Sequence, residues 1–346
     1  MTSKVRIARD APLQQRNTFG VAARAPWLVS VDDAAALPEA LHTAPLRDGL
    51  ALALGGGSNL LFAGDPDGAV LELSGRRIEV LGDDGERAIV RADAGVVWHG
   101  FVMHTLAQSL CGLENLALIP GTVGASPIQN IGAYGVEVRD FVHAVEAFEP
   151  ASGQWHRFDN AACEFAYRDS RFKQSPDRYL IAAVEFALPR RPALKLDYAG
   201  IGEELAAMGA SAPTAQNVAD AVIAIRRRKL PDPAVLGNAG SFFKNPIVAA
   251  AQAEALLAQH PAMPVFRGAD ADSRKLSAGW LIDACGWKGH RDGDAGVSPA
   301  HALVLVNYGG ASGLQLLDLA RRIAGSVRER FGVAIEPEPR IVGARW

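Results

Sequence analysis

Two glycine-rich segments carry the residue types best suited to holding a phosphate group. The first reads LALGGGSNLLF over residues 52–62, where an apolar run leads directly into Gly55, Gly56, Gly57, Ser58 and Asn59. Consecutive glycines allow backbone N–H groups to turn toward an anion without obstruction by a Cβ atom. The segment therefore predicts an anion-binding turn at the end of a strand, although a simple tight turn has the same sequence signature.

A dinucleotide-binding turn of the Rossmann type is the main alternative for this first segment. Its G-x-G-x-x-G pattern, started at Gly55, requires glycine at position 60, where the chain has leucine. A helix must also follow such a turn, whereas LLF at residues 60–62 indicates a strand. We therefore exclude Rossmann geometry for this site.

The second segment, residues 119–135, reads IPGTVGASPIQNIGAYG. Four glycines alternate with the polar residues Thr122, Ser126, Gln129 and Asn130. A loop of this length and glycine content in a compact domain is usually functional, and its backbone can lie flat against a ligand. A surface omega-loop is the alternative interpretation.

The elements around these loops predict a β-α-β start. Residues 27–31 and 51–54 are expected to be strands on either side of a helix over 32–46 that Asp32 caps. Residues 69–73 and 87–93 are expected to form a hairpin. Apolar spacing predicts a helix over 97–110 that ends near Gly112, and residues 142–149 and 179–188 have strand composition.

Helical patterns dominate after a boundary near residue 190. Helices are predicted over Val218–Arg228, Val248–Gln259, Ser277–Ala284 and Leu314–Phe331, the last with Ser312 as cap and Gly332 as stop. A strand over residues 301–307 lies among them. This pattern favours a separate α+β domain.

Bulk composition excludes several classes of protein. A net charge of −3 over 346 residues gives no overall basic field for nucleic acid or an anionic membrane. Cys111, Cys163 and Cys285 are too few and too far apart for a disulfide framework, and we interpret all three as core thiols. No signal peptide, membrane-spanning run or convincing metal-ligand spacing is present, so we expect a cytoplasmic protein that binds no metal.

Motifs along nearly the whole chain resemble the UDP-N-acetylenolpyruvoylglucosamine reductases. NTFG at residues 17–20, GGGSN and PGTVGASPIQNIGAYG carry the resemblance in the first half. The motifs that follow are YRDSRFK at 167–173, KLPDP at 229–233, GNAGSFFKNP at 237–246, KLSAGWLIDACGWKG at 275–289, HALVLVN at 301–307 and EPEPRIVG at 336–343. So many independent motifs in order make chance similarity implausible.

The resemblance implies an α+β protein with a vanillyl-alcohol-oxidase type FAD-binding fold and a C-terminal substrate domain. We expect FAD subdomains at residues 1–75 and 76–190 and a substrate-binding domain at 191–332, with 333–346 returning to the first. FAD is expected to bind non-covalently through its pyrophosphate. The expected contacts are Asn17, Thr18, Gly55, Gly56, Gly57, Ser58, Asn59, Pro120, Gly121, Thr122, Gly124, Ala125, Ser126, Gln129, Asn130, Gly132, Ala133, Tyr134 and Gly135.

The resemblance also implies three catalytic residues. Arg168 matches an arginine that orients the substrate carboxylate, and a guanidinium fork suits that task. Ser241 matches the proton donor, and Glu338 matches a catalytic glutamate, with Glu336 as the alternative. Without the resemblance, a surface ion pair, a turn serine and a solvated rim glutamate would explain these residues.

Three further residues are expected to bind substrate. Lys229 and Asn245 match contacts of the family, and Tyr198 resembles the tyrosine of a loop that covers the substrate's diphosphate in one subgroup. The segment 192–212 around Tyr198 is compatible with a loop or a linker. His301 stands where some members have glutamine, so we assign it no role.

The implied function is NADPH-dependent reduction of UDP-N-acetylglucosamine enolpyruvate to UDP-N-acetylmuramate in peptidoglycan synthesis. The expected partners are these two small molecules, without nucleic acid or membrane insertion, and the expected state is a monomer. The alternatives are another oxidoreductase of the same flavin fold, a non-catalytic binder of flavin or nucleotide sugar, and a serine hydrolase. The hydrolase is weakened because G-x-S-x-G is absent.

Overall fold

The computed structural model describes residues 4–47, 49–268 and 270–346, which form two compact units. Unit 1 comprises the chain through Ala11, Ala25–Gly56 and Asp67–Arg228. Unit 2 comprises Pro12–Arg24, Gly57–Pro66 and Lys229–Trp346. The chain therefore crosses between the units within the first glycine-rich turn. The expected domain boundaries at residues 75, 190 and 332 stay a prediction.

The first sheet of unit 1 has four strands in the order β1 (Val5–Pro12), β2 (Arg24–Val31), β5 (Ala69–Leu73) and β3 (Leu50–Leu54). β2 and β3 both run parallel to β5, which confirms the predicted strands and gives the parallel arrangement of a β-α-β unit. Its apolar side is buried with the short helices α1 (Leu37–Leu41) and α2 (Ala44–Arg47) in one core cluster.

The single helix expected over residues 32–46 is wrong, and so is its cap. The segment breaks into a 3-10 turn, α1 and α2, and Asp33 rather than Asp32 accepts the hydrogen bond from Ala35 N. The carboxylate of Asp32 is instead bonded to Arg6 and to the hydroxyl of Ser74, so it is not available to the helix. Tertiary contacts therefore override the local capping signal.

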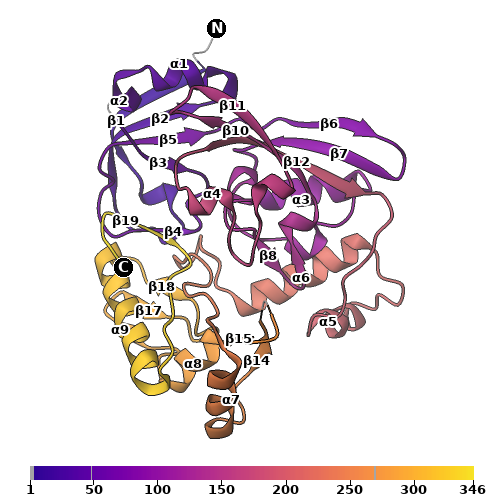
Figure 1. Cartoon of the computed structure of the whole chain (residues 1–346), viewed down its shortest axis with the longest axis vertical. Coiled ribbons are helices and arrows are strands. Elements are labelled where there is room, and N and C mark those ends of the chain that lie inside the picture. Colours follow the sequence, from indigo (N-terminus) through magenta and orange to yellow (C-terminus); the bar gives the residue numbers. More distant parts are fainter. Residues whose placement is uncertain (1–3, 48, 269) are drawn as a thin grey trace. The chain divides into compact units, whose positions relative to one another are not determined.

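The second sheet of unit 1 has five antiparallel strands in the order β11 (Gln154–Asp159), β10 (Val142–Glu149), β12 (Leu180–Pro189), β7 (Arg87–Asp93) and β6 (Ile78–Asp83). In Figure 1 the paired strands β6 and β7 extend beyond the rest of this sheet. The hairpin expected between residues 69–73 and 87–93 is wrong, because β6 is the partner of β7 and β5 belongs to the first sheet.

Helices α3 (Trp98–Ala107) and α6 (Ala215–Lys229) supply apolar residues to the core of this sheet. Trp98 is 1% exposed, and its indole N–H donates to the carbonyl of Leu116 at 2.9 Å. The C-cap of α3 is Gln108, so the helix ends before the Gly112 stop that the sequence suggested. Cys111 and Cys163 are buried thiols, as expected, and burial raises the pKa of Cys163 to about 12. Cys285 is only partly buried, so its assignment to the core is wrong.

Unit 2 confirms the helices predicted beyond residue 229. They are α7 (Ala250–Gln259), α8 (Ala278–Ala284) and α9 (Gly313–Phe331). The N-terminus of α9 has a capping box of Ser312 and Gln315, and Gly332 ends it at φ +65°. Strand β4 (Leu60–Phe62) pairs in parallel with β19 (Arg340–Val342), so the residues after the first glycine-rich turn lie beside the chain's C-terminal strand.

Two small antiparallel sheets complete unit 2. One has the order β13 (Ile247–Ala249), β15 (Ser273–Leu276) and β14 (Val265–Arg267), and the other β16 (Arg291–Asp292), β17 (Ala295–Val297) and β18 (Leu305–Asn307). The strand predicted over residues 301–307 is therefore confined to its last three residues.

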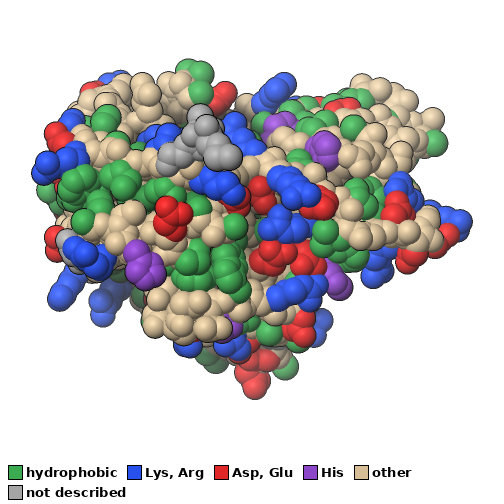
Figure 2. All heavy atoms as spheres, turned by 90° about the horizontal axis from the view of Figure 1, so that it is seen from above, with side chains coloured by type: hydrophobic (Ala, Val, Ile, Leu, Met, Phe, Trp, Pro, Cys, Tyr) green, Lys and Arg blue, Asp and Glu red, His purple; other side chains and the backbone are tan. Residues whose placement is uncertain are grey.

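Positive and negative side chains are interspersed on the face shown in Figure 2. Among the ion pairs of unit 1, Arg91 lies 2.8 Å from both Asp93 and Glu146. A surface of mixed sign agrees with the charge argument made from the sequence. Over residues 4–47, 49–268 and 270–346, no helix has the length and apolar content needed to cross a bilayer.

Candidate active site

The two glycine-rich segments meet backbone to backbone within unit 1. A Cβ atom on Gly56 would lie 2.9 Å from Gly121 Cα, and one on Gly55 would lie 2.9 Å from Thr122 Oγ1. The contact of Gly56 is with backbone and excludes any larger residue, so glycine is required at that position by the close approach itself. A cradle built mainly of glycine backbone is the surface that a pyrophosphate needs, and these residues therefore fit the group that the sequence predicted.

The end of the first turn is held by the NTFG segment within unit 2. Gly57 has φ +62°, and a Cβ atom there would lie 2.0 Å from the carbonyl oxygen of Arg16. Thr18 N donates to the Gly57 carbonyl at 3.1 Å. The Asn17 amide donates to the carbonyls of Leu13 and Val21 and accepts from Val21 N. The Asn17 side chain therefore fixes the backbone of residues 13–21, and this segment packs closely against the buried Gly57.

The second glycine-rich segment is fixed by its own polar side chains. Ser126 is buried and donates its hydroxyl proton to the Val123 carbonyl at 2.7 Å. Asn130 has φ +47° and donates to Glu137 at 2.9 Å and to the Ala166 carbonyl at 3.0 Å. Of the remaining expected contacts, Pro120 and Gly135 are exposed, Gly124 is buried, and Gly121, Thr122, Ala125, Gln129, Gly132, Ala133 and Tyr134 are partly buried.

Arg168 lies directly against this second segment. A tight turn of Ala166–Asp169 places it at φ +55°, and its Nη2 donates to the Gly132 carbonyl at 2.9 Å. The neighbouring Ser170 hydroxyl donates to the Ile128 carbonyl at 2.5 Å, which docks the turn on the loop. A left-handed conformation at a non-glycine residue costs on the order of 1–3 kcal/mol and is concentrated at functional sites. Through its own hydrogen bond to Gly132 and that of Ser170 to Ile128, the structure brings Arg168 to the predicted cofactor loop.

Ser241 and Glu338 are brought together within unit 2. Phe243 and Pro337 form an antiparallel bridge, and Glu338 N donates to the Phe242 carbonyl at 2.7 Å. Phe242 and Phe243 are 0% and 1% exposed, so the two residues that follow Ser241 are anchored in the core of unit 2. Ser241 itself is partly buried and follows Gly240, which has φ +69°. The hydroxyl and the glutamate thus come from adjacent, hydrogen-bonded segments.

Glu336 and Glu338 differ in their surroundings although they are two residues apart. The Glu336 side chain is 72% exposed and lies 3.8 Å from Lys244 Nζ. Glu338 is partly buried, and its carbonyl accepts a hydrogen bond from Asn59 Nδ2 at 3.4 Å. The first glycine-rich segment therefore also contacts the segment that carries Glu338.

The expected substrate residues of unit 2 occupy different environments. Lys229 is exposed at the end of α6, whereas Asn245 is partly buried and accepts from Ala278 N at 3.0 Å, next to the start of α8. Burial lowers the pKa of His301, and the charges of Lys229 and Lys288 lower it further. A neutral imidazole is therefore favoured beside Lys229.

Tyr198, in unit 1, contacts the second glycine-rich segment. Its ring is 50% exposed and packs edge-on against Tyr134, with centroids 5.2 Å apart. Burial raises the pKa of Tyr134, while a hydrogen bond and the charge of Arg226 act in the opposite direction. The segment 192–212 is not wholly irregular, since α5 (Ile201–Ala207) follows the tyrosine. The residues before this helix, 192–200, form no helix or strand, which is compatible with either a loop or a linker.

Two polar residues near Tyr134 were missed by sequence reasoning. Arg226 belongs to the cationic run RRRK at residues 226–229, at the end of α6, yet burial lowers its pKa and it hydrogen-bonds to the phenol of Tyr134. Its spacing of four residues from the buried Val222, which itself follows the buried Val218 by four, could have separated it from Arg227 and Arg228. Asn115 is 1% exposed within the segment LENLA at residues 113–117, and no motif singled it out.

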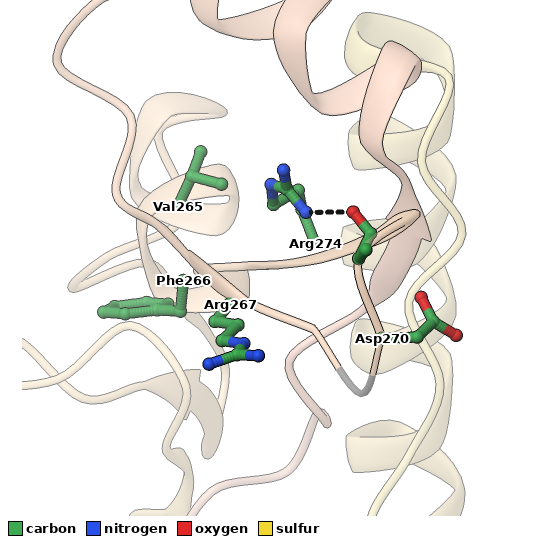
Figure 3. A pocket seen from close by; sticks show the side chains of 6 residues that line it. Val265, Phe266, Arg267, Asp270 and Arg274 are labelled. Carbon is green, nitrogen blue, oxygen red and sulfur yellow. Dashed lines mark hydrogen bonds between the residues drawn. The ribbon is translucent and has the colours of Figure 1, made fainter.

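A surface hollow of about 430 Å³ lies elsewhere in unit 2, on strands β14 and β15. It is lined by Val265, Phe266, Arg267, Asp270, Ala271 and Arg274. Figure 3 shows Arg274 turned to the Ala271 carbonyl, to which it donates at 2.8 Å. No residue that lines this hollow is one of those expected to be catalytic or ligand-binding. Among the described residues, no group of three or more His, Cys, Asp or Glu side chains could hold a metal ion.

Comparison with known proteins covers both halves of the chain. A family model described as "FAD binding domain" matches residues 25–159, and one described as "UDP-N-acetylenolpyruvoylglucosamine reductase, C-terminal domain" matches residues 232–342. The second match includes both GNAGSFFKNP and the start of EPEPRIVG, the segments that carry Ser241 and Glu338.

Whole-chain relatives carry the same description. A UDP-N-acetylenolpyruvoylglucosamine reductase of Xanthomonas euvesicatoria is 61% identical over 340 residues, 98% of this chain and 97% of the relative. One of Xylella fastidiosa is 59% identical over 338 residues, 97% of this chain and 96% of the relative. The solved structure of such a reductase from Thermus caldophilus superposes with a TM-score of 0.67 at 27% identity, over 97% of this chain and 98% of that one.

Proposed function

The chain belongs to the UDP-N-acetylenolpyruvoylglucosamine reductase family, and we therefore propose that it reduces the enolpyruvyl group of UDP-N-acetylglucosamine enolpyruvate. The product is UDP-N-acetylmuramate, a precursor of peptidoglycan, and NADPH is the reductant. The observation that supports this most is 61% identity over 98% of the chain. Another oxidoreductase of the same flavin fold would leave the match of residues 232–342 unexplained.

FAD, when bound, accepts a hydride from NADPH and supplies it to the substrate. We propose that its pyrophosphate is held by the backbone where Gly55 and Gly56 approach Gly121 and Thr122. The fit is supported by the glycine backbone that makes up most of this cradle and by its N–H groups. Binding is expected to be non-covalent.

Arg168 is proposed to orient the substrate carboxylate. Its guanidinium stays charged at any working pH and presents two parallel N–H donors, which match the two oxygens of a carboxylate. Its left-handed backbone and its bond to the Gly132 carbonyl hold it against the cofactor loop before substrate arrives. As hydride adds to the terminal enolpyruvyl carbon, negative charge develops on the carboxylate side of the substrate, and Arg168 stabilises it.

Ser241 is proposed to donate the proton to the carbon that the hydride does not attack. A neutral serine is a weak acid, so this step requires an intermediate that is already a strong base. Glu338 is proposed to share that proton or hold a water, because its segment is hydrogen-bonded to the residue after Ser241. Addition of one hydride and one proton converts the enolpyruvyl ether to the lactyl ether.

Lys229, Asn245 and Tyr198 are proposed to bind the nucleotide sugar, with Tyr198 covering its diphosphate. The half-exposed ring of Tyr198 beside Tyr134 supports a mobile contact of this kind. A cytoplasmic location and a monomeric state stay predictions.

The two glutamates give the test of the proposed proton step. Glu338→Gln is expected to slow reoxidation of the NADPH-reduced flavin by substrate about 100-fold, since it removes a group that shares the proton. Glu336→Gln is expected to change it less than about twofold, as for an exposed surface pair. Anaerobic stopped-flow absorbance of the flavin measures both rates. An equal loss of rate in the two variants, or a loss only in Glu336→Gln, would contradict the assignment of the proton-sharing role to Glu338.

A further inference from the structure

Asn115 links two segments of unit 1 that are distant in the sequence. Its side-chain amide donates to the Tyr134 carbonyl and to the Lys195 carbonyl, each at 2.9 Å. The residue is 1% exposed and lies between the buried residues Leu113 and Leu116. The N–H groups of one solvent-excluded amide are therefore used to hold two backbone segments next to each other.

The first of these carbonyls belongs to a residue that is held from both ends. Tyr134 has φ +51° within the second glycine-rich segment, and Arg226 hydrogen-bonds to its phenol. Asn115 restrains its backbone. Tyr134 is thus restrained at its backbone by Asn115 and at its phenol by Arg226, both in the same unit, and not by its loop alone.

The second carbonyl lies at the base of the turn that carries Tyr198. Leu194 and Leu196, on either side of Lys195, pack against the core of unit 1, and Ile201 is buried at the start of α5. Only residues 197–200 lie between these fixed points. The tyrosine turn is therefore short, and Asn115 restrains it three residues before Tyr198.

We propose that Asn115 is a positioning residue for substrate binding. Its two hydrogen bonds set the turn 197–200 relative to Tyr134. The Tyr134 and Tyr198 rings are thereby presented together to the nucleotide sugar. The inference rests on the proposed role of Tyr198. Without the amide, two buried carbonyls lose their partner and the turn occupies other positions. The apparent affinity for substrate then falls by the fraction of molecules in the competent position.

This role predicts a specific kinetic signature. A residue that acts on ground-state binding raises KM and leaves kcat unchanged. Asn115→Leu keeps the approximate volume of the side chain and removes both donors. We expect it to raise KM for UDP-N-acetylglucosamine enolpyruvate about tenfold, while FAD content and the rate of flavin reduction by NADPH stay as in the wild type.

A double-mutant cycle with Tyr198→Ala separates positioning from general stability. If Asn115 acts by setting Tyr198 relative to Tyr134, then Asn115→Leu raises KM less in the Tyr198→Ala background than in the wild type, because the pairing of the two rings is already lost. The cycle is measured on the full-length holoenzyme with the two single variants and the double variant. Asn160→Leu is the matched control, because the Asn160 amide also bridges two carbonyls of unit 1, those of Arg139 and Val142.

The outcomes separate the inference from the proposed function. No change of KM in Tyr198→Ala would remove the proposed role of that residue and the inference with it. A raised KM in Tyr198→Ala combined with an unchanged KM in Asn115→Leu, or with additive effects of the two, would overturn the inference alone. Loss of FAD in Asn115→Leu, or an equal rise of KM in Asn160→Leu, would also overturn it. Should Asn115→Leu fail to fold, Asn115→Ser, which can satisfy at most one carbonyl, takes its place in the same cycle with the same expectations.

Discussion

Replacement of Ser241 by alanine is expected to slow the transfer of reducing equivalents from flavin to substrate by about 10³-fold, with no effect on reduction of the flavin by NADPH. The hydroxyl is the proposed proton source for the substrate carbon, and alanine leaves the buried Phe242 and Phe243 around it in place. Only the half-reaction that needs a proton on carbon should respond. Single-turnover absorbance at the flavin band, after anaerobic reduction, measures this rate.

Ser326→Ala provides the control for Ser241. The Ser326 hydroxyl also makes hydrogen bonds in unit 2, accepting from Trp287 Nε1 at 2.7 Å and donating to the Ile323 carbonyl at 2.8 Å, so its loss tests the effect of removing a structural hydroxyl. We expect reduced stability and an unchanged reoxidation rate. A Ser241→Ala protein that reoxidises with substrate at the wild-type rate would exclude Ser241 as the proton donor.

Arg168→Lys is expected to slow the same half-reaction about 100-fold, although it preserves the positive charge. An ammonium group cannot give the two parallel hydrogen bonds of a guanidinium fork, and stabilisation of charge at a fixed place depends on that geometry. Lysine can adopt the same left-handed backbone at the same cost, so the substitution isolates the head group from the turn at φ +55°. Steady-state kinetics and single-turnover reoxidation measure the loss.

The neighbouring Arg171→Lys is the matched control for Arg168. Arg171 lies in the same YRDSRFK motif and donates to the Ala162 carbonyl at 2.6 Å, so it serves the local structure. Its replacement should leave both half-reactions within about twofold of the wild type. If Arg168→Lys instead loses FAD or slows NADPH oxidation to the same extent, its bond to the Gly132 carbonyl, rather than contact with substrate, would explain the effect.

Periodicity predicted the long elements well and the short ones poorly. Helix α9 was predicted to within a residue, because Ser312, Gln315 and Gly332 cap it locally. The helix expected from Asp32 failed because the partners of that carboxylate, Arg6 and Ser74, lie far away in the sequence. The predicted strand partner of residues 87–93 was wrong for a similar reason, because β5 pairs in parallel with β2 and β3, which lie outside the predicted hairpin.

The candidate site was predicted from motifs, whereas its supports were not. Glycine patterns indicated where a backbone could approach an anion, and the approach of Gly56 to Gly121 agrees with that interpretation. Asn115 and Arg226 could not be found in this way, because each acts through one or two contacts with residues remote in sequence. The antiparallel pairing of Phe243 with Pro337 likewise joins two motifs that the sequence presents separately.

The measurement that tests the central claim most directly is an anaerobic half-reaction series on the purified wild-type protein. The flavin spectrum is recorded, the protein is reduced with NADPH, and UDP-N-acetylglucosamine enolpyruvate is then added in slight excess. We predict that the yellow colour bleaches with NADPH and returns on addition of the nucleotide sugar, with UDP-N-acetylmuramate formed in equal amount. A reduced flavin that stays bleached in the presence of this substrate, or one that only an alcohol or sugar can reduce, would contradict the proposed reaction.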